Sequence, residues 1–171
     1  MLNQKLENYS NPIAQVKNFE ISAESLWELI SSPGNLNDCH PYCFSNEVLQ
    51  WNGKEHRDRL IYLNSRTYIR RFQSWNEGSG YTLIIGEEGD KQSLVTWSIE
   101  EISLYKSKLT ISVYPYLLAK LPRIISFLPY VIWIRPRLKK YLKSVLSGFE
   151  YVVINDEAVP RNYFGPHPWF S

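Results

Sequence analysis

The sequence predicts an α+β protein in which a curved antiparallel sheet of about seven strands wraps around a long C-terminal helix. Three observations support this fold class: a short helical pattern comes early, about six strand-like runs follow it, and an amphipathic helical pattern comes late. Short polar turns separate successive runs, which favours antiparallel pairing. A long helix that lies across such a sheet encloses apolar space.

Two short helices are predicted after the first strand. Ser22 is a suitable N-cap residue, and Glu24 lies in the first helical turn, where the helix dipole favours a negative charge. Apolar residues recur with helical spacing within 23–31. Pro33 and the glycine after it end this helix and precede a second, shorter helical turn over 35–39.

The strand-like runs are rich in apolar, aromatic and β-branched residues, and several alternate apolar with polar side chains. Turn sequences such as Asn52-Gly53 end them. The predicted strands are 9–21, 44–51, 59–63, 67–75, 81–87, 93–102 and 109–114.

The late helix is predicted over 136–154, where apolar residues follow i, i+3, i+4 spacing for four turns. Pro136 lies near its first position, where proline is tolerated. Gly148 lies inside it and costs about 1 kcal/mol relative to alanine. Close packing against the sheet is the favoured explanation for this glycine, and room for a ligand is the alternative.

The segment 116–134 is the most apolar part of the chain. Prolines at seven-residue intervals, from Pro115 to Pro136, predict short turns or kinked helical pieces over 115–136 rather than one helix. The longest uncharged run, 124–134, is too short to span a bilayer. Basic residues cluster after it. They are expected to form a solvated helix face, with contact to anionic lipid head groups as the alternative.

A chain of 171 residues suits one domain with a tail. We expect the domain to cover 1–154 and a proline- and aromatic-rich tail to cover 155–171. Aromatic side chains favour a tail that docks on the domain rather than one that stays in solvent. The aromatic residues of the tail are Tyr163, Phe164, Trp169 and Phe170.

Composition excludes some classes of function. A net charge of +2 is too small to indicate a nucleic-acid-binding protein. The two cysteines do not make a disulfide framework, which favours a reducing compartment, and the N-terminal residues lack the apolar core of a signal peptide. We therefore expect a cytoplasmic protein, with peripheral membrane contact through 116–134 as a further expectation.

The cysteines and a neighbouring histidine suggest a metal or nucleophile site only weakly. Cys39, His40 and Cys43 have a CxxxC spacing without the matching second pair of ligands that zinc sites use. Adjacent side chains on a helix diverge, so His40 is poorly placed to activate Cys39. No phosphate-binding glycine loop or nucleophile elbow occurs in the sequence. We predict no metal, no cofactor and no catalytic residue.

The order of these elements resembles the START-like, Bet v 1-like (SRPBCC) superfamily, which includes polyketide cyclase-like and lipid-transfer domains. SAESLWELISSPGNLNDCHPYC at 22–43 and NEVLQWNG at 46–53 resemble its first helices and the strand after them. The resemblance covers about 9–154 and implies a helix-grip fold with an apolar cavity between the sheet and the last helix. Members include carriers, cyclases, receptors and chaperone activators, so it implies no catalytic residue. Later strands resemble it in GYTLIIG (80–86), VTWSIE (95–100) and LTISVYPY (109–116).

The expected function is binding or transport of a hydrophobic small molecule or lipid in that cavity. The identity of the ligand and the oligomeric state stay open. The candidate cavity residues, chosen for their place on strands or on the helix stripe, are Trp27, Tyr68, Arg70, Phe72, Leu83, Ile85, Val95, Trp97, Ile111, Val113, Leu142, Leu146 and Phe149.

An enzyme of the polyketide cyclase or dehydratase type is the alternative. It would use Arg70 with a nearby tyrosine or glutamate as general acid and base in the same cavity. Tyr68, Arg70 and Phe72 share one face of a predicted strand, and Arg71 lies on the other. Which face points inward stays open, and exposure to water is the favoured interpretation for both arginines.

Overall fold

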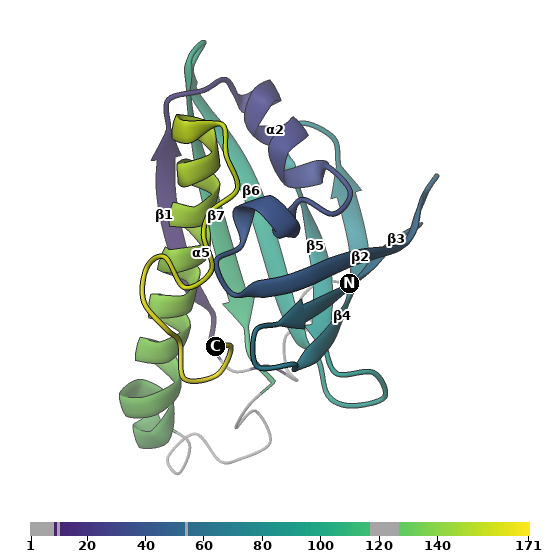
Figure 1. The fold of residues 1–171 in the computed structure, drawn as a ribbon, viewed down its shortest axis with the longest axis vertical. Coiled ribbons are helices and arrows are strands. Elements are labelled where there is room, and N and C mark those ends of the chain that lie inside the picture. Colours follow the sequence, from purple (N-terminus) through teal and green to yellow (C-terminus); the bar gives the residue numbers. More distant parts are fainter. Residues whose placement is uncertain (1–8, 10, 54, 117–126) are drawn as a thin grey trace.

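In the part of the chain that the structure describes, seven antiparallel strands form one open sheet in the order β1-β7-β6-β5-β4-β3-β2 (Figure 1). The computed structural model describes residues 9, 11–53, 55–116 and 127–171. Each strand from β2 to β6 pairs with the next along the chain, and β1 pairs with β7, which confirms the predicted antiparallel sheet. The strands are β1 (Ile13–Phe19), β2 (Cys43–Asn52), β3 (Glu55–Tyr62), β4 (Thr67–Asn76), β5 (Gly80–Gly86), β6 (Ser93–Ser103) and β7 (Lys106–Tyr114).

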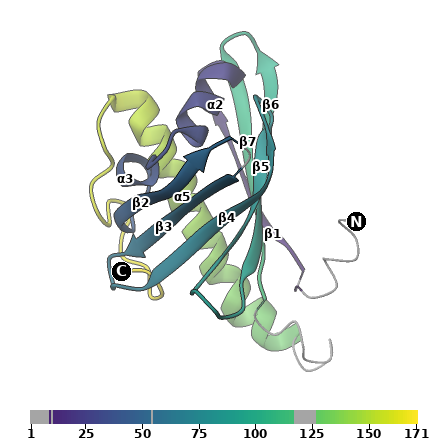
Figure 2. The same cartoon turned by 90° about the vertical axis from the view of Figure 1, so that its right-hand side faces the viewer.

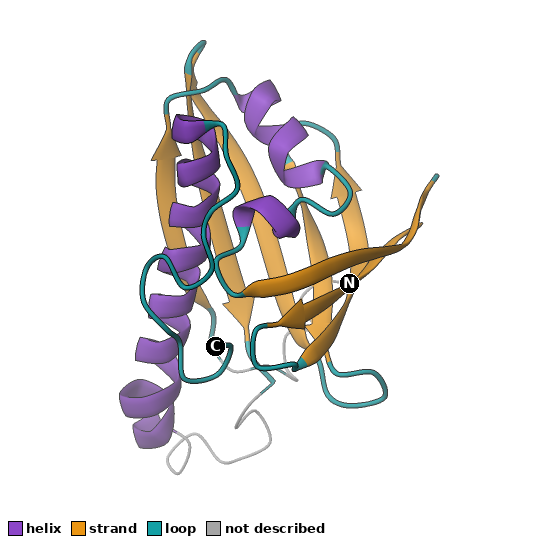
Figure 3. Cartoon of the chain, in the orientation of Figure 1, coloured by secondary structure: helices purple, strands orange, loops and turns teal. Residues whose placement is uncertain are grey.

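The helices cover one face of the sheet. Helices α2 (Ala23–Ser31) and α3 (Leu36–Cys39) follow β1, and the long α5 (Arg135–Asn155) lies along the same face (Figure 2, Figure 3). The Ser22 hydroxyl accepts a hydrogen bond from the Ser25 N–H at 3.0 Å and caps α2 as predicted. Two short helices after the first strand and one long helix at the end are therefore confirmed.

The long helix starts earlier than predicted. Helical backbone begins at Phe127, passes through a π-helical turn, η1 (Tyr130–Ile134), and continues as α5. Pro136 lacks an N–H, and its ring would clash with the carbonyl four residues back in a regular helix. The wider turn before it accommodates the proline. The prediction of separate turns or kinked pieces is therefore wrong for 127–134, and 117–126 lie outside the described residues.

Strand β3 also starts earlier than predicted, at Glu55 instead of residue 59. The charged run before Leu60 looks unlike a strand, yet Asp58 is fully buried there. Its cross-strand partner in β4 is Arg70. Cross-strand pairing thus allows a charged sequence to enter the inner face of the sheet.

Gly148 allows α5 to pass close to α3. A Cβ atom at this position would lie 2.1 Å from the carbonyl oxygen of Cys39, far inside van der Waals contact. Close packing is therefore the reason for the glycine, but its neighbour is α3, not the sheet that the sequence suggested. The contact fixes α3 against the middle of the long helix.

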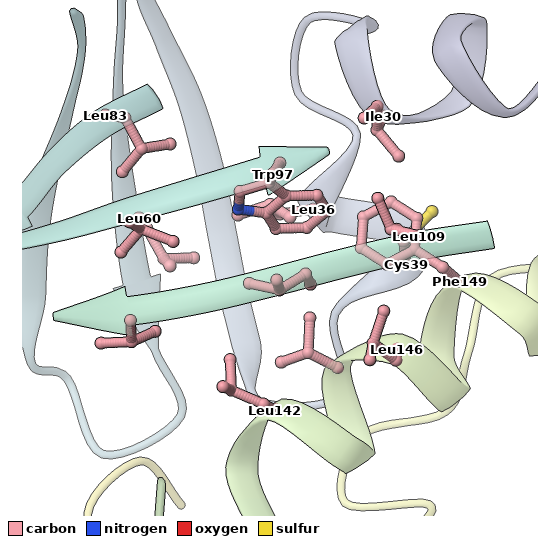
Figure 4. Close-up of a cluster of buried hydrophobic side chains, with 14 of the residues drawn as sticks. Ile30, Leu36, Cys39, Leu60, Leu83, Trp97, Leu109, Leu142, Leu146 and Phe149 are labelled. Carbon is pink, nitrogen blue, oxygen red and sulfur yellow. The ribbon is translucent and has the colours of Figure 1, made fainter. Parts of the chain in front are cut away.

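The core fills the space between the inner face of the sheet and the helices (Figure 4). Leu142, Leu146 and Phe149 extend from α5 toward the sheet. Phe149 meets Trp97 of β6 edge-on, with ring centroids 5.4 Å apart. The helical stripe and the alternating strands thus bury their apolar faces against each other.

Residues 156–171 leave α5 and fold back over α3 and the strands beside it (Figure 1). Asp156 adopts a left-handed backbone conformation that ends the helix. The Val159 N–H donates to the Asp38 carbonyl at 2.8 Å, and the Asn162 N–H donates to the Pro41 carbonyl at 2.9 Å. This C-terminal segment therefore has backbone contacts with the loop that carries α3.

Candidate functional site

A cavity of about 50 Å³ lies between the sheet and α5. Seven of the thirteen candidate residues line it: Arg70, Leu83, Ile85, Val95, Trp97, Ile111 and Leu142. The other lining residues, which the candidate set omits, are Leu36, His40, Leu60, Tyr141 and Val145. Tyr141 and Val145 belong to the same helical stripe as Leu142, so the periodicity of the helix could have identified them. For Leu36 and His40 the sequence carries no such signal.

Six candidates do not line the cavity. Trp27 of α2 packs edge-on against Trp75, with ring centroids 5.2 Å apart. Phe72 contacts Trp51, and Tyr68 lies near Phe170. The three remaining candidates, Val113, Leu146 and Phe149, are buried in the core outside the cavity lining.

The cavity is small because side chains occupy most of the interior. Pockets for small organic ligands usually measure about 300 to 1,000 Å³. A space of about 50 Å³ has room for roughly one or two water molecules. A larger guest needs side chains or a segment of the chain to move.

A chain of hydrogen bonds links His40 to two tyrosines at the cavity. His40 Nε2 lies 2.9 Å from the Tyr141 hydroxyl, which lies 3.1 Å from the Tyr62 hydroxyl. His40 Nδ1 accepts a hydrogen bond from the Tyr42 N–H at 3.1 Å. We therefore place the proton of the neutral imidazole on Nε2, where it donates to Tyr141.

Burial keeps these groups uncharged. It lowers the pKa of His40 to about 3, and the positive charge of Arg70 acts in the same direction. Burial raises the pKa values of the Tyr62 and Tyr141 hydroxyls above the ordinary value for tyrosine. At neutral pH the three groups are uncharged, and His40 and Tyr141 form a neutral hydrogen-bonding edge on an apolar cavity.

Arg70 points inward and is paired. Its Nε donates to Asp58 Oδ1 at 2.7 Å, and a second guanidinium nitrogen donates to Oδ2. Arg70 is 3% exposed and Asp58 is 0% exposed, so the expectation that Arg70 faces water is wrong. Burial alone would lower the pKa of Arg70, but the charge and hydrogen bonds of Asp58 outweigh it and raise that pKa. Arg71, on the other face, forms a surface ion pair with Glu88.

Both cysteines are buried thiols. Burial raises the pKa values of Cys39 and Cys43 to about 12, so at neutral pH both are thiols rather than the thiolate that nucleophilic attack needs. Within the residues that the structure describes, no group of three His, Cys, Asp or Glu side chains is arranged to hold a metal ion.

A second hollow, of about 270 Å³, lies between β4 and the β2–β3 turn. Regular β3–β4 pairing stops at Arg57 and Arg71, and β4 is irregular just beyond, between Phe72 and Ser74. Glycine, glutamine and serine make up half of the residues that line this hollow, so it is a surface hollow rather than an apolar site. Its lining residues are Gly53, His56, Phe72, Gln73, Ser74 and Trp75.

Solved structures show where this architecture recurs. A START superfamily protein from Mycobacterium smegmatis superposes with a TM-score of 0.65 at 11% identity, covering 85% of this chain and 98% of that one. The di-domain ARO/CYC BexL from the BE-7585A biosynthetic pathway gives a TM-score of 0.67 at 12% identity, covering 85% of this chain and 48% of its own. Ara h 8.0201 superposes with a TM-score of 0.59 at 15% identity, covering 84% of this chain and 96% of that one.

These similarities establish that the chain has a START/Bet v 1-like, helix-grip fold, as the sequence predicts. No family model and no curated protein matches the sequence. In the described part of the chain, no helix is long and apolar enough to cross a membrane.

Proposed function

We propose that this protein binds a hydrophobic small molecule or lipid between the sheet and α5. The composition of the cavity wall is the observation that carries the proposal. Of the twelve described residues in that wall, nine are apolar, and the three polar ones, His40, Arg70 and Tyr141, are neutral or neutralised. Apolar surface of a ligand that enters such a site contributes about 25 cal/mol per Å² to binding.

The charge state of the site supports binding better than catalysis. General acid–base catalysis needs a group whose pKa lies near the working pH. Here burial lowers the pKa of His40 far below neutral pH. It raises the pKa of Tyr141 above the ordinary tyrosine value, which already lies above neutral pH. Arg70 is held in a bidentate pair by Asp58. The cyclase or dehydratase alternative would first require these groups to leave their present partners.

The start of the long helix supports a contact with membranes. Phe127, Leu128, Ile132 and Trp133 are all exposed. They precede the basic residues of α5, of which Lys139 and Lys140 are exposed as well. Exposed apolar side chains beside basic ones suit the surface of an anionic bilayer. We propose that residues 127–133 touch such a surface when the ligand is exchanged.

Native mass spectrometry of protein purified without detergent tests ligand binding. We expect a species heavier than the polypeptide by the mass of one small molecule, which extraction with organic solvent removes. Val95→Phe places a ring in the cavity and is expected to lose most of this species. Val48→Phe makes the same change at an exposed position and should retain it. Bare polypeptide from the wild type, or equal loading of both variants, contradicts the proposal.

Sedimentation with vesicles tests the membrane contact. Wild-type protein should sediment with vesicles that contain phosphatidylserine more than with vesicles of phosphatidylcholine alone. Replacing Leu128 and Ile132 by serine should abolish most of this binding, because both side chains are exposed at the start of the helix. Leu104→Ser, in the exposed β6–β7 turn at the far end of the sheet (Figure 1), is the matched control. Equal sedimentation of the double variant and the control refutes the contact.

A further inference from the structure

The ring of Phe170 occupies an aromatic box beside the cavity. It stacks on Tyr62 with centroids 4.4 Å apart and on His167 with centroids 5.2 Å apart. Tyr141 lies 4.6 Å away, and Tyr68 meets the ring edge-on at 6.4 Å. Phe170 is only 6% exposed. Four flat side chains thus enclose one phenyl ring, and one of them, His167, belongs to the same short turn as Phe170 and moves with it.

The segment that carries Phe170 is held largely by its own hydrogen bonds. The Phe170 and Ser171 N–H groups both donate to the His167 carbonyl, at 3.1 and 3.0 Å. The Trp169 N–H donates to His167 Nδ1 at 3.3 Å, and the His167 N–H donates to the Ser171 hydroxyl at 2.8 Å. Residues 167–171 therefore form a compact turn that can move as one unit.

Among the described residues, three hydrogen bonds join this turn to the rest of the chain, and one of them runs from the Ser171 hydroxyl to Asn162 Oδ1 at 2.6 Å. His167 Nε2 lies 3.0 Å from the Arg137 carbonyl, and the Asn64 side chain donates to the Trp169 carbonyl at 2.8 Å. Gly165, just before the turn, has a φ of +86°, a conformation that glycine adopts without strain. Freeing the box breaks these three hydrogen bonds and withdraws three rings: Phe170, His167 from Tyr42, and Trp169 from Trp133.

The box and the cavity share a wall. Tyr141 lines the cavity and also contacts the Phe170 ring. Tyr62, which stacks on Phe170, is hydrogen-bonded to Tyr141. A guest that takes the place of Phe170 therefore lies next to the polar edge of the cavity. Space that the cavity of about 50 Å³ lacks is available once the turn leaves.

We propose that the aromatic box is a binding site for a planar, uncharged aromatic ring, and that Phe170 is its intramolecular occupant, which a ligand displaces. This inference rests on the proposed ligand-binding function and names the chemical class that the site takes. Three tyrosine rings offer faces and edges that suit an aromatic guest. A ligand must compete with the tethered ring, so the closed turn lowers the apparent affinity of the site.

Fluorescence titration with N-phenyl-1-naphthylamine, an uncharged aromatic probe, tests the proposal on the full chain. Removing the competing ring with Phe170→Ala should lower the Kd of the probe about tenfold. Phe170→Leu keeps an apolar side chain without the stacking and should give a smaller decrease. Tyr163→Ala removes an exposed aromatic ring from the same segment and should leave the Kd at the wild-type value. Circular dichroism confirms that each variant is folded.

Hydrogen exchange of the wild-type protein provides a second measurement that needs no variant. Saturation with the probe should accelerate exchange of the Phe170 and Ser171 amides, whose N–H groups bond to His167 in the closed turn. Equal Kd values for wild type and Phe170→Ala, or probe binding that leaves these amides protected, overturns the box and leaves the proposed function standing. Absence of binding by wild type and by both Phe170 variants overturns both.

Discussion

Arg70 and Asp58 face each other across neighbouring strands, and the guanidinium forms two hydrogen bonds with the carboxylate beneath the helices. Both side chains are almost completely removed from solvent. Their charges cancel at the edge of an apolar cavity, which makes the interior suitable for a neutral guest. A charge left alone there would have no water to solvate it.

Asp58→Asn should therefore destabilise the protein strongly. Removing one partner of a buried ion pair leaves an uncompensated charge, and such changes typically cost about 3 to 5 kcal/mol. Urea unfolding at pH 7 measures the loss. Glu88→Gln breaks exposed ion pairs with Arg57 and Arg71 and should cost less than about 1 kcal/mol. Similar losses of unfolding free energy for the two variants would show that the buried Arg70 pair matters no more to stability than the exposed pairs.

Stability should fall at acid pH because His40 stays neutral in the folded protein. The pKa of His40 is about 3 when folded, against an ordinary value of 6.5. Below pH 6.5 the unfolded chain therefore takes up a proton that the folded chain does not, and unfolding becomes easier. His40 alone removes about 1.4 kcal/mol of unfolding free energy per pH unit in this window.

Urea unfolding between pH 7 and pH 4, of wild type and His40→Gln, isolates this effect. Burial also lowers the pKa of His167, so the wild-type slope contains more than one histidine. When the free energy of unfolding is plotted against pH, the variant should show a slope that is smaller by the uptake of about one proton. This holds whatever the stability of the variant at pH 7. Parallel curves would mean that His40 is protonated in the folded state.

Gly148→Ala should destabilise the protein although alanine is the better helix former. The added Cβ would meet the Cys39 carbonyl oxygen at 2.1 Å, and backbone must shift to relieve the overlap. Overpacking of this kind costs about 1 to 3 kcal/mol, more than the gain of about 1 kcal/mol in helix propensity. Thermal unfolding measures the balance. Lys143→Ala, at an exposed position of the same helix, serves as control, and a stabilised Gly148→Ala variant contradicts the packing.

Local patterns predicted the fold well because its elements are amphipathic. The apolar run of β5, alternation in β6 and β7 and the stripe of α5 predict apolar walls, and Leu83, Val95, Trp97, Ile111 and Leu142 do line the cavity. Each of these residues lies in an apolar run or follows a period that the local sequence displays. The start of the long helix was missed because a proline normally ends a helix, and the sequence does not show that a π-helical turn absorbs it.

The polar part of the site depends on contacts between distant residues, which local patterns do not contain. Arg70 points inward because the carboxylate of Asp58, on the neighbouring strand, compensates the charge of its guanidinium. His40 and Tyr141 are 101 positions apart in sequence and meet only when α3 packs on α5. Phe170 reaches Tyr62 because residues 156–171 fold back over the domain. Tertiary structure, rather than residue type, therefore decides which polar groups face the cavity.

Methyl NMR of valine-labelled protein tests most directly whether a guest enters the interior. Val95 and Val145 line the cavity, whereas Val16 and Val48 are exposed. Titration with N-phenyl-1-naphthylamine should shift the Val95 and Val145 methyl signals and leave those of Val16 and Val48 unchanged, because an aromatic ring perturbs only nearby methyl groups. Shifts confined to the exposed valines, or unmoved cavity valines at saturation in both wild type and Phe170→Ala, would contradict an internal ligand site.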